Sequence, residues 1–270
     1  MEHMHSIHPS VFLNNKVMLW TLIDRWYQMS RQIVSEDKDI SNGMDIDWDD
    51  LKDKIAIVKR ICKWDELKDR WTDRSIHETH KQLAFEFMFE CVFCHNDLLG
   101  GNILYLQNEH CVKFVDFEYG HYNFRAFEFA NHFCEYCGFD CNWKQGFPSQ
   151  YHMRDFLTCY VKEYVKPIAV DTSHSNTASD IQLRKNEALV SKLKRLHEQR
   201  SQSTENGKKW DCFIQTCVDI VLCFACADHV YWGLWGVVQA KHSKIDFDFK
   251  KYAKDRLLHG LQFALSKVSL

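Results

Sequence analysis

The sequence predicts a mainly helical α+β domain that carries one small β-hairpin. Two apolar runs, 103–106 and 112–117, are separated by the polar residues 107–110, a pattern typical of a hairpin. Longer stretches on both sides of these runs have helical character. The chain has 270 residues, 14% of them aromatic, with only three prolines and ten glycines. It is therefore long enough to bury a substantial core.

The helices are expected in four main segments. Residues 17–33 and 51–89 precede the hairpin, and 125–136 and 211–241 follow it. Positions 91 and 94 lie in a short apolar run that is expected to form a further strand. The core is therefore expected to come mostly from helices.

A polar segment, 171–209, interrupts the second half of the chain. It is rich in Ser, Asn, Lys and Glu, and its centre, 181–200, is compatible with a helix. We expect a surface insertion whose charged helix is solvated, with partner docking as the less favoured alternative.

Composition excludes several classes of protein. The formal net charge is −3, so there is no basic surface for nucleic acid. Residues 1–10 lack the basic start and apolar run of a secretory signal, which predicts a cytoplasmic location. The apolar stretch 212–238 contains Asp219 and Asp228, so we expect a buried core helix and no membrane span.

Twelve cysteines raise the question of a zinc site. The close pairs are Cys91/Cys94, Cys134/Cys137 and Cys223/Cys226. Strand positions three apart face opposite sides, and helical pairs lack the turn of a zinc knuckle. Reduced, mostly buried cysteines are the favoured interpretation, with structural zinc as the alternative.

The most informative stretch runs from position 94 to position 120. Asp97 is followed at the fifth position by Asn102, and Asp116 comes about a dozen residues later within Asp116-Phe117-Glu118. Phosphotransferases use this order for a base, a metal-binding amide and a metal-binding carboxylate. Either half alone is also explained by an ordinary turn, but two ordered halves favour an active site.

Four ordered blocks of residues carry a family resemblance: His95-Asn96-Asp97-Leu98-Leu99 with Asn102-Ile103, Asp116-Phe117-Glu118-Tyr119 with Tyr122-Asn123-Phe124-Arg125-Ala126-Phe127, Asn131-His132-Phe133-Cys134-Glu135, and Trp232-Gly233-Leu234-Trp235 with Gln239-Ala240-Lys241. In these blocks the chain resembles the choline/ethanolamine kinase family. The resemblance implies a protein kinase-like fold and transfer of the ATP γ-phosphoryl group to an amino alcohol with Mg²⁺.

The resemblance also implies roles for particular residues. Asp97 is expected to be the base, and Asn102 and Asp116 are expected to bind the metal. Glu118 is a further carboxylate for the metal, on the argument that it shares a strand face with Asp116; the alternative is a structural acceptor.

A cationic substrate needs aromatic faces and a carboxylate. Trp232 and Trp235 lie three positions apart on one helix, which places both indoles on one face. Glu135 is expected to supply the countercharge, and Tyr252 to complete the substrate site. Without the resemblance, two such tryptophans are more often part of the core.

Ethanolamine is the favoured substrate, because Leu98-Leu99 after the base resembles the ethanolamine-kinase form of the motif. The product would be phosphoethanolamine, in the CDP-ethanolamine pathway of phosphatidylethanolamine biosynthesis. Choline kinase or dual specificity is the alternative. A primary ammonium needs hydrogen-bond acceptors and a quaternary ammonium needs none. The sequence does not decide the oligomeric state, for which a homodimer is one candidate.

The residues before Asp97 contain one glycine, Gly43, and the stretches 17–33 and 51–89 among them have helical character. A Gly-rich strand pair with a strand Lys, which grips ATP in kinase-like enzymes, is not recognisable there. By resemblance, 1–10 matches the interior of a family chain. We therefore expect the larger, C-terminal lobe across 1–270, with low affinity for ATP. A truncated, non-catalytic relative with a binding or regulatory role is the competing interpretation.

Overall fold

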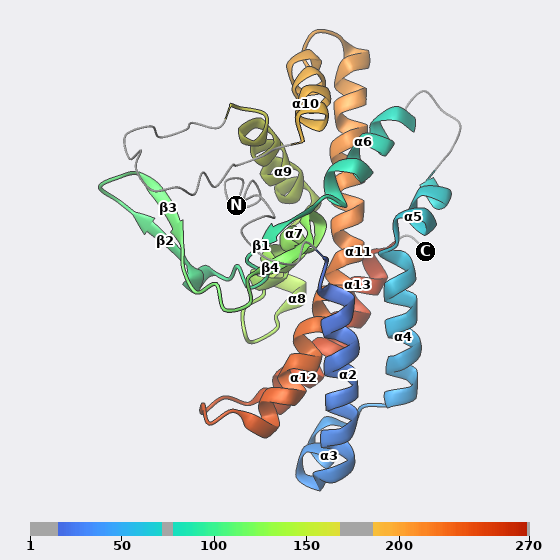
Figure 1. Cartoon of the computed structure of the whole chain (residues 1–270), viewed down its shortest axis with the longest axis vertical. Helices are drawn as coiled ribbons and strands as arrows, with labels where there is room; N and C mark the ends of the chain where they lie inside the picture. Colours follow the sequence, from blue (N-terminus) through green and yellow to red (C-terminus); the bar gives the residue numbers. More distant parts are fainter. Residues whose placement is uncertain (1–15, 72–77, 168–185, 269–270) are drawn as a thin grey trace.

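The computed structural model describes residues 16–71, 78–167 and 186–268 (Figure 1). The described helices are α2 (Leu19–Glu36), α3 (Lys38–Met44), α4 (Trp48–Ile61), α5 (Trp64–Trp71), α6 (Glu78–Met88), α7 (Arg125–Glu135), α8 (Trp143–Gly146), α9 (Gln150–Tyr164), α10 (Glu187–Gln199), α11 (Thr204–His242), α12 (Phe249–Lys254) and α13 (Leu261–Lys267). The strands are β1 (Cys91–Cys94), β2 (Ile103–Leu106), β3 (Cys111–Phe114) and β4 (His121–Phe124). The mainly helical α+β architecture agrees with the sequence prediction.

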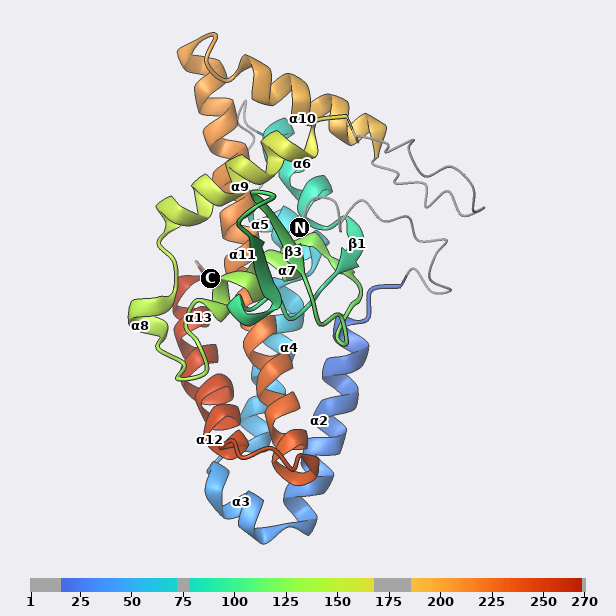
Figure 2. The same ribbon diagram turned by 90° about the vertical axis from the view of Figure 1, so that its left-hand side faces the viewer.

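The helix α11 forms the axis of the molecule, and α2, α4, α6, α7 and α13 pack around it (Figures 1 and 2). Phe213, Val221 and Val230 are fully buried along its length. A helix that is apolar on nearly all sides belongs in the core of a protein or in a membrane. This helix is long and apolar enough to cross a membrane, but 78% of its most apolar window is buried inside the protein. Its place in the fold is that of a core helix.

The start of α11 differs from the prediction. We expected a helix over 211–241, whereas the helix begins at Thr204, because Ser203 caps it and accepts a hydrogen bond from the Asn206 N–H at 3.2 Å. The first two turns are polar, so hydrophobic periodicity does not mark them.

Two antiparallel strand pairs lie beside the helical body. β1 pairs with β4, with Cys91 opposite Phe124, and β2 pairs with β3, with Ile103 opposite Phe114. The β2–β3 hairpin is the predicted one, and it extends away from the helices (Figure 1). Asn102 stands directly before its first strand. The second strand ends at Phe114, three residues earlier than expected.

The polar segment contains a packed helix. Of 171–209, residues 171–185 lie outside the described residues, and α10 covers most of the remainder. Leu189, Leu193 and Leu196 share one face of α10 and are buried, and α10 contacts α6, α9 and α11. The expectation of a solvated helix is therefore wrong for this face.

The C-terminal segment crosses α11 closely. Between α12 and α13 the helix contains a π-helical turn, η4 (Asp255–Gly260). A Cβ atom on Gly233 would lie 2.5 Å from the Leu257 Cγ atom, and one on Gly236 would lie 3.1 Å from the Tyr252 ring. The two glycines thus allow this segment to reach the face of α11 that carries Trp232 and Trp235.

Candidate active site

The loop after β1 is held in place by hydrogen bonds to a side chain of α7. The carboxylate of Glu128 accepts hydrogen bonds from the backbone N–H groups of His95, at 3.2 Å, and Asn96, at 2.9 Å. Asn96 has a left-handed backbone with φ of 63°, a conformation that Asn tolerates better than most residues. The buried Glu128 thereby holds the turn that presents Asp97.

The side chain of Asn96 joins this loop to the segment after Asp116. Its Nδ2 donates to the carbonyl oxygens of Tyr119, at 2.9 Å, and Cys94, at 3.1 Å. Its Oδ1 accepts from the Asn123 Nδ2 at 2.9 Å. One buried amide therefore connects both halves of the sequence motif.

Asn102 lies in a short 3₁₀ turn, η2 (Gly100–Asn102), at the entry to β2. Its Nδ2 donates to the carbonyl oxygen of Asp97 at 2.9 Å and to the Asp97 Oδ2 at 3.3 Å. This arrangement fixes the amide and leaves its oxygen, Oδ1, as the atom available to a metal.

Asp116 is placed by the residue before it. The Val115 N–H donates to the Asn102 carbonyl at 3.1 Å, and the Val115 carbonyl accepts from the His95 Nε2 at 2.8 Å. Asp116 itself adopts a left-handed backbone with φ of 63°. The structure thus brings Asp97, Asn102 and Asp116 together as the spacing predicts, while their roles stay predictions.

Negative charge converges on Asp97. Burial, followed by the charges of Glu135, Asp116 and Asp228 in that order, raises the pKa of this carboxyl to about 8. Carboxylates that oppose each other's ionisation favour a bound cation. The site is therefore electrostatically suited to a metal ion, an ammonium group or both.

Glu118 does not lie where the strand argument placed it. Because β3 ends at Phe114 and the backbone turns at Asp116, Glu118 does not share a strand face with that residue. It lies exposed in the turn that leads to Tyr119. The geometric reason for expecting Glu118 at the metal is therefore wrong, and its role as a ligand remains an untested expectation.

Aromatic side chains form a wall beside this turn. The ring centroids of Trp232 and Trp235 are 5.1 Å apart, and that of Tyr119 lies 5.1 Å from Trp232. Tyr252 approaches from α12, with its centroid 6.2 Å from Trp235. The Trp232 Nε1 atom is buried and has no hydrogen-bond partner among the described residues. We call Tyr119, Trp232, Trp235 and Tyr252 the aromatic wall.

Glu135 lies at the end of α7 and pairs with Arg256 from η4 at 2.6 Å. Arg256 also pairs with Asp228 from α11 at 2.8 Å. Both Asp228 and Arg256 are almost fully buried. The predicted countercharge is therefore part of an ion network that holds one negative charge in excess.

A model of the family described as choline/ethanolamine kinase matches residues 1–259. The chain belongs to the choline/ethanolamine kinase family. The probable ethanolamine kinase A of Dictyostelium discoideum is 36% identical over 165 residues, which are 61% of this chain and 36% of that protein. Ethanolamine kinase 2 of Rattus norvegicus is 25% identical over 253 residues, which are 94% of this chain and 49% of that protein. The chain thus spans at most about half of these family members.

Solved structures of this family share the fold. A Plasmodium vivax ethanolamine kinase matches 96% of this chain and 54% of its own, with a TM-score of 0.60 and 24% identity. A choline kinase from Cryptosporidium parvum Iowa II matches 98% of this chain and 63% of its own, with a TM-score of 0.59 and 20% identity. These likenesses confirm the predicted protein kinase-like fold.

Sequence reasoning missed three residues of this family member's candidate site: Tyr119, Asp228 and Arg256. Tyr119 stands in the same motif as Asp116, and its position next to a predicted metal ligand was an available signal. Asp228 appeared only as a polar interruption of an apolar helix, which is itself a signal of a buried polar contact. No sequence pattern marks Arg256.

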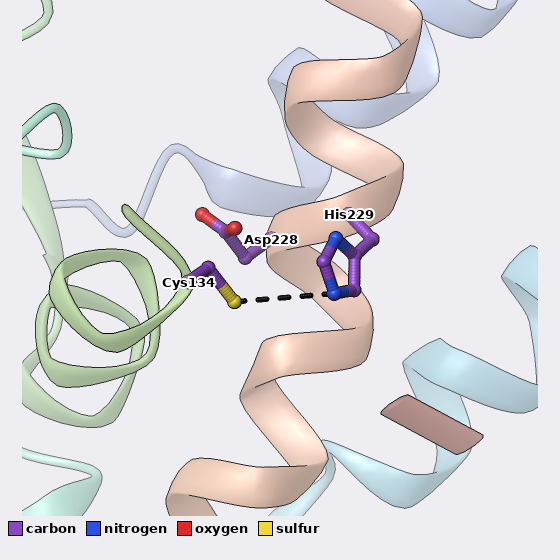
Figure 3. A group of neighbouring side chains, drawn as sticks. All are labelled: Cys134, Asp228 and His229. Carbon is purple, nitrogen blue, oxygen red and sulfur yellow. Dashed lines mark hydrogen bonds between the residues drawn. The ribbon is translucent and has the colours of Figure 1, made fainter. Parts of the chain in front are cut away.

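One buried cluster has the residue types of a metal site. Cys134, Asp228 and His229 lie together, with 4.0 Å between the Cys134 Sγ and the His229 Nε2 (Figure 3). The three ligand atoms lie within 4.8 Å of one another, but the two oxygens of the Asp228 carboxylate already accept hydrogen bonds from Asn131 and Arg256. The guanidinium already supplies the cation there, so the cluster serves the ion network.

Proposed function

We propose that this chain carries the catalytic lobe of an ethanolamine kinase, which transfers the γ-phosphoryl group of ATP to the hydroxyl of ethanolamine. The product, phosphoethanolamine, enters the CDP-ethanolamine route to phosphatidylethanolamine. One observation carries the proposal: the Asp97–Asn102–Asp116 group adjoins an aromatic wall with a negatively charged network beside it. The names of the relatives support the same substrate class.

Asp97 is the base in this proposal. Its Oδ2 receives a hydrogen bond from Asn102, which orients the carboxylate and leaves its other oxygen for the substrate hydroxyl. Asp97 accepts the hydroxyl proton as the oxygen attacks the γ-phosphorus, and the bond from that phosphorus to the bridging oxygen breaks, so that ADP leaves. Holding the two reacting atoms in line supplies most of the rate enhancement in such reactions.

The donor set fits Mg²⁺. The Asn102 Oδ1 and the Asp116 carboxylate are hard oxygen ligands, and the Asn102 Nδ2 is already directed to Asp97. When bound, the ion would neutralise charge on the phosphate oxygens.

The ammonium group fits the aromatic wall. Trp235 is half-buried and offers a π-face, while Trp232 is 3% exposed and contacts the Trp235 ring. Glu135 retains its Oε2 after the Oε1 accepts from Arg256. The excess negative charge of the network offsets the positive charge of the substrate. The same wall favours choline as a second candidate, because a quaternary ammonium needs faces more than acceptors.

The test is phosphorus NMR of the reaction catalysed by the purified 270-residue chain with MgATP and either ethanolamine or choline. Asp97→Asn is the matched inactive control. We expect a phosphoethanolamine signal that is absent with Asp97→Asn, and a weaker or equal signal from choline. A folded wild-type protein that gives neither product contradicts the proposal and favours the non-catalytic, regulatory relative.

A further inference from the structure

Three buried side chains and the half-buried Glu135 connect the substrate end of the candidate site to the backbone beside its base. They form a continuous chain of polar contacts that runs Glu135, Arg256, Asp228, Asn131. The Glu135 Oε1 accepts from Arg256 at 2.6 Å, the Asp228 Oδ2 accepts from Arg256 at 2.8 Å, and the Asp228 Oδ1 accepts from the Asn131 Nδ2 at 3.0 Å. The Asn131 Oδ1 then accepts from the Leu98 N–H at 3.0 Å.

The last contact matters because Leu98 directly follows Asp97. α7 holds this residue at both of its backbone groups. Asn131 accepts from its N–H, and the His132 Nδ1 donates to its carbonyl at 2.9 Å. The backbone on the C-terminal side of the base is therefore fixed by side chains and not by secondary structure.

Asp228 determines which way the Asn131 amide points. An amide has a donor end and an acceptor end, and a carboxylate can only accept. With its donor end committed to Asp228, Asn131 must turn its oxygen towards Leu98. A neutral partner at position 228 would allow the amide to flip and present its N–H₂ group to the Leu98 N–H.

Arg256 fixes Asp228 in turn. Its guanidinium is 1% exposed and lies 5.2 Å from the ring centroids of both Trp143 and Tyr252. The planar fork can reach two carboxylates at once, which a lysine ammonium cannot do with the same geometry. The π-helical turn η4 carries Arg256, and such turns recur at functional sites.

The charges that face the guanidinium are the carboxylates of Asp228 and Glu135. The neighbouring His229 is neutral, because burial lowers its pKa well below the usual range. The Cys134 thiol is also neutral, because burial raises its pKa well above the usual range. Arg256 is therefore shared between Glu135 at the end of α7 and Asp228 on α11, which in turn accepts from Asn131 on α7.

We propose that Asn131, Asp228 and Arg256 are positioning residues that hold the base Asp97 in register with the cation-binding carboxylate Glu135. This inference rests on the proposed function for the identity of the two ends, while the connection itself is a property of the fold. Loss of Arg256 therefore frees both Glu135 and the Leu98 backbone, whereas loss of Asn131 affects mainly the Leu98 backbone.

The first test does not depend on turnover. Amide hydrogen exchange at Leu98 is measured in the wild type, in Asp228→Asn and in Arg256→Lys, with the Phe224 amide in the core of α11 as the reference for global unfolding. Asp219→Asn is the matched control, because Asp219 lies on the same helix and accepts from Gln215 at 2.9 Å. We expect exchange at Leu98 to become about tenfold faster relative to Phe224 in Asp228→Asn and in Arg256→Lys, and to stay unchanged in Asp219→Asn.

The second test separates kcat from KM. Asn131→Ala leaves the Arg256 ion pairs in place, so we expect kcat to fall about tenfold with little change in the KM for ethanolamine. Arg256→Lys should raise KM as well as lower kcat, because Glu135 loses its partner. Asp219→Asn should change neither.

The inference is overturned if exchange at Leu98 follows the Phe224 amide in every variant, whether or not the protein turns over. It is also overturned if Asn131→Ala alters KM and kcat in equal measure. A wild-type protein without kinase activity refutes the proposed function, and the exchange result then decides the connection by itself.

Discussion

Trp235 donates its indole N–H to the hydroxyl of Tyr119 across 2.9 Å. This contact joins the core helix α11 to the turn that follows Asp116, although the two residues are 116 positions apart in the sequence. It ties the aromatic wall to the loop that carries a predicted metal ligand. This hydrogen bond and the contact of the Tyr119 and Trp232 rings, 5.1 Å apart, together place the aromatic wall relative to the loop of Asp116.

Removal of this hydrogen bond should weaken substrate binding. In Tyr119→Phe the Trp235 N–H loses its acceptor, and an intramolecular hydrogen bond contributes about 1 kcal/mol. We expect the KM for ethanolamine to rise about fivefold with a smaller change in kcat. Steady-state kinetics on Tyr119→Phe, with the exposed Tyr151→Phe as control, checks this. An unchanged KM would show that the contact does not shape the substrate site.

The pH dependence of catalysis should report the carboxylates around Asp97. A base must be ionised, and burial raises the pKa of Asp97 to about 8, with Glu135 the largest charge contribution. Activity should therefore rise with pH through this pKa, at a lower pH once Mg²⁺ is bound. In Glu135→Gln the rising part of the pH profile should move to lower pH, because removal of the negative charge of Glu135 lowers the pKa of Asp97.

The pH profile is measured with choline, because its quaternary ammonium does not titrate and so adds no pKa of its own. The measurement is kcat/KM for choline against pH at saturating MgATP, for the wild type and Glu135→Gln. A rising part that stays in place or moves to higher pH in the variant would mean that Glu135 does not act on the base.

The glycines of α11 should matter for stability in a position-dependent way. A Cβ atom at Gly233 would lie 2.5 Å from the Leu257 side chain, so Gly233→Ala should lower the free energy of unfolding by about 1–3 kcal/mol. Gly207→Ala on the same helix meets nothing closer than 3.4 Å and should be neutral or stabilising by up to about 1 kcal/mol. Urea denaturation followed by circular dichroism measures both, and equal effects would argue against close packing at Gly233.

The sequence predicted the parts of the site that depend on local spacing. Asp97, Asn102 and Asp116 come together because a tight hairpin and its two flanking turns are short-range features. Trp232 and Trp235 were predicted to share a face because a helix repeats about every 3.6 residues.

Other parts depend on contacts that no local pattern encodes. Asp228 and Arg256 belong to different elements, and their pairing arises only when η4 crosses α11 at Gly233. The strand that should have carried Glu118 ends early because Asp116 adopts a left-handed backbone, which the apolar pattern of 112–117 does not indicate. The buried face of α10 was missed because its leucines are diluted by charged residues.

The central claim is that Asp97 is the base of an ATP-dependent ethanolamine kinase. Its most direct test is the steady-state turnover of ethanolamine by the wild type and Asp97→Asn, with Asp155→Asn as an exposed control. Loss of a general base should lower kcat by about 10²-fold or more while the KM for ethanolamine stays within a few fold. An Asp97→Asn protein that retains wild-type kcat would contradict the account.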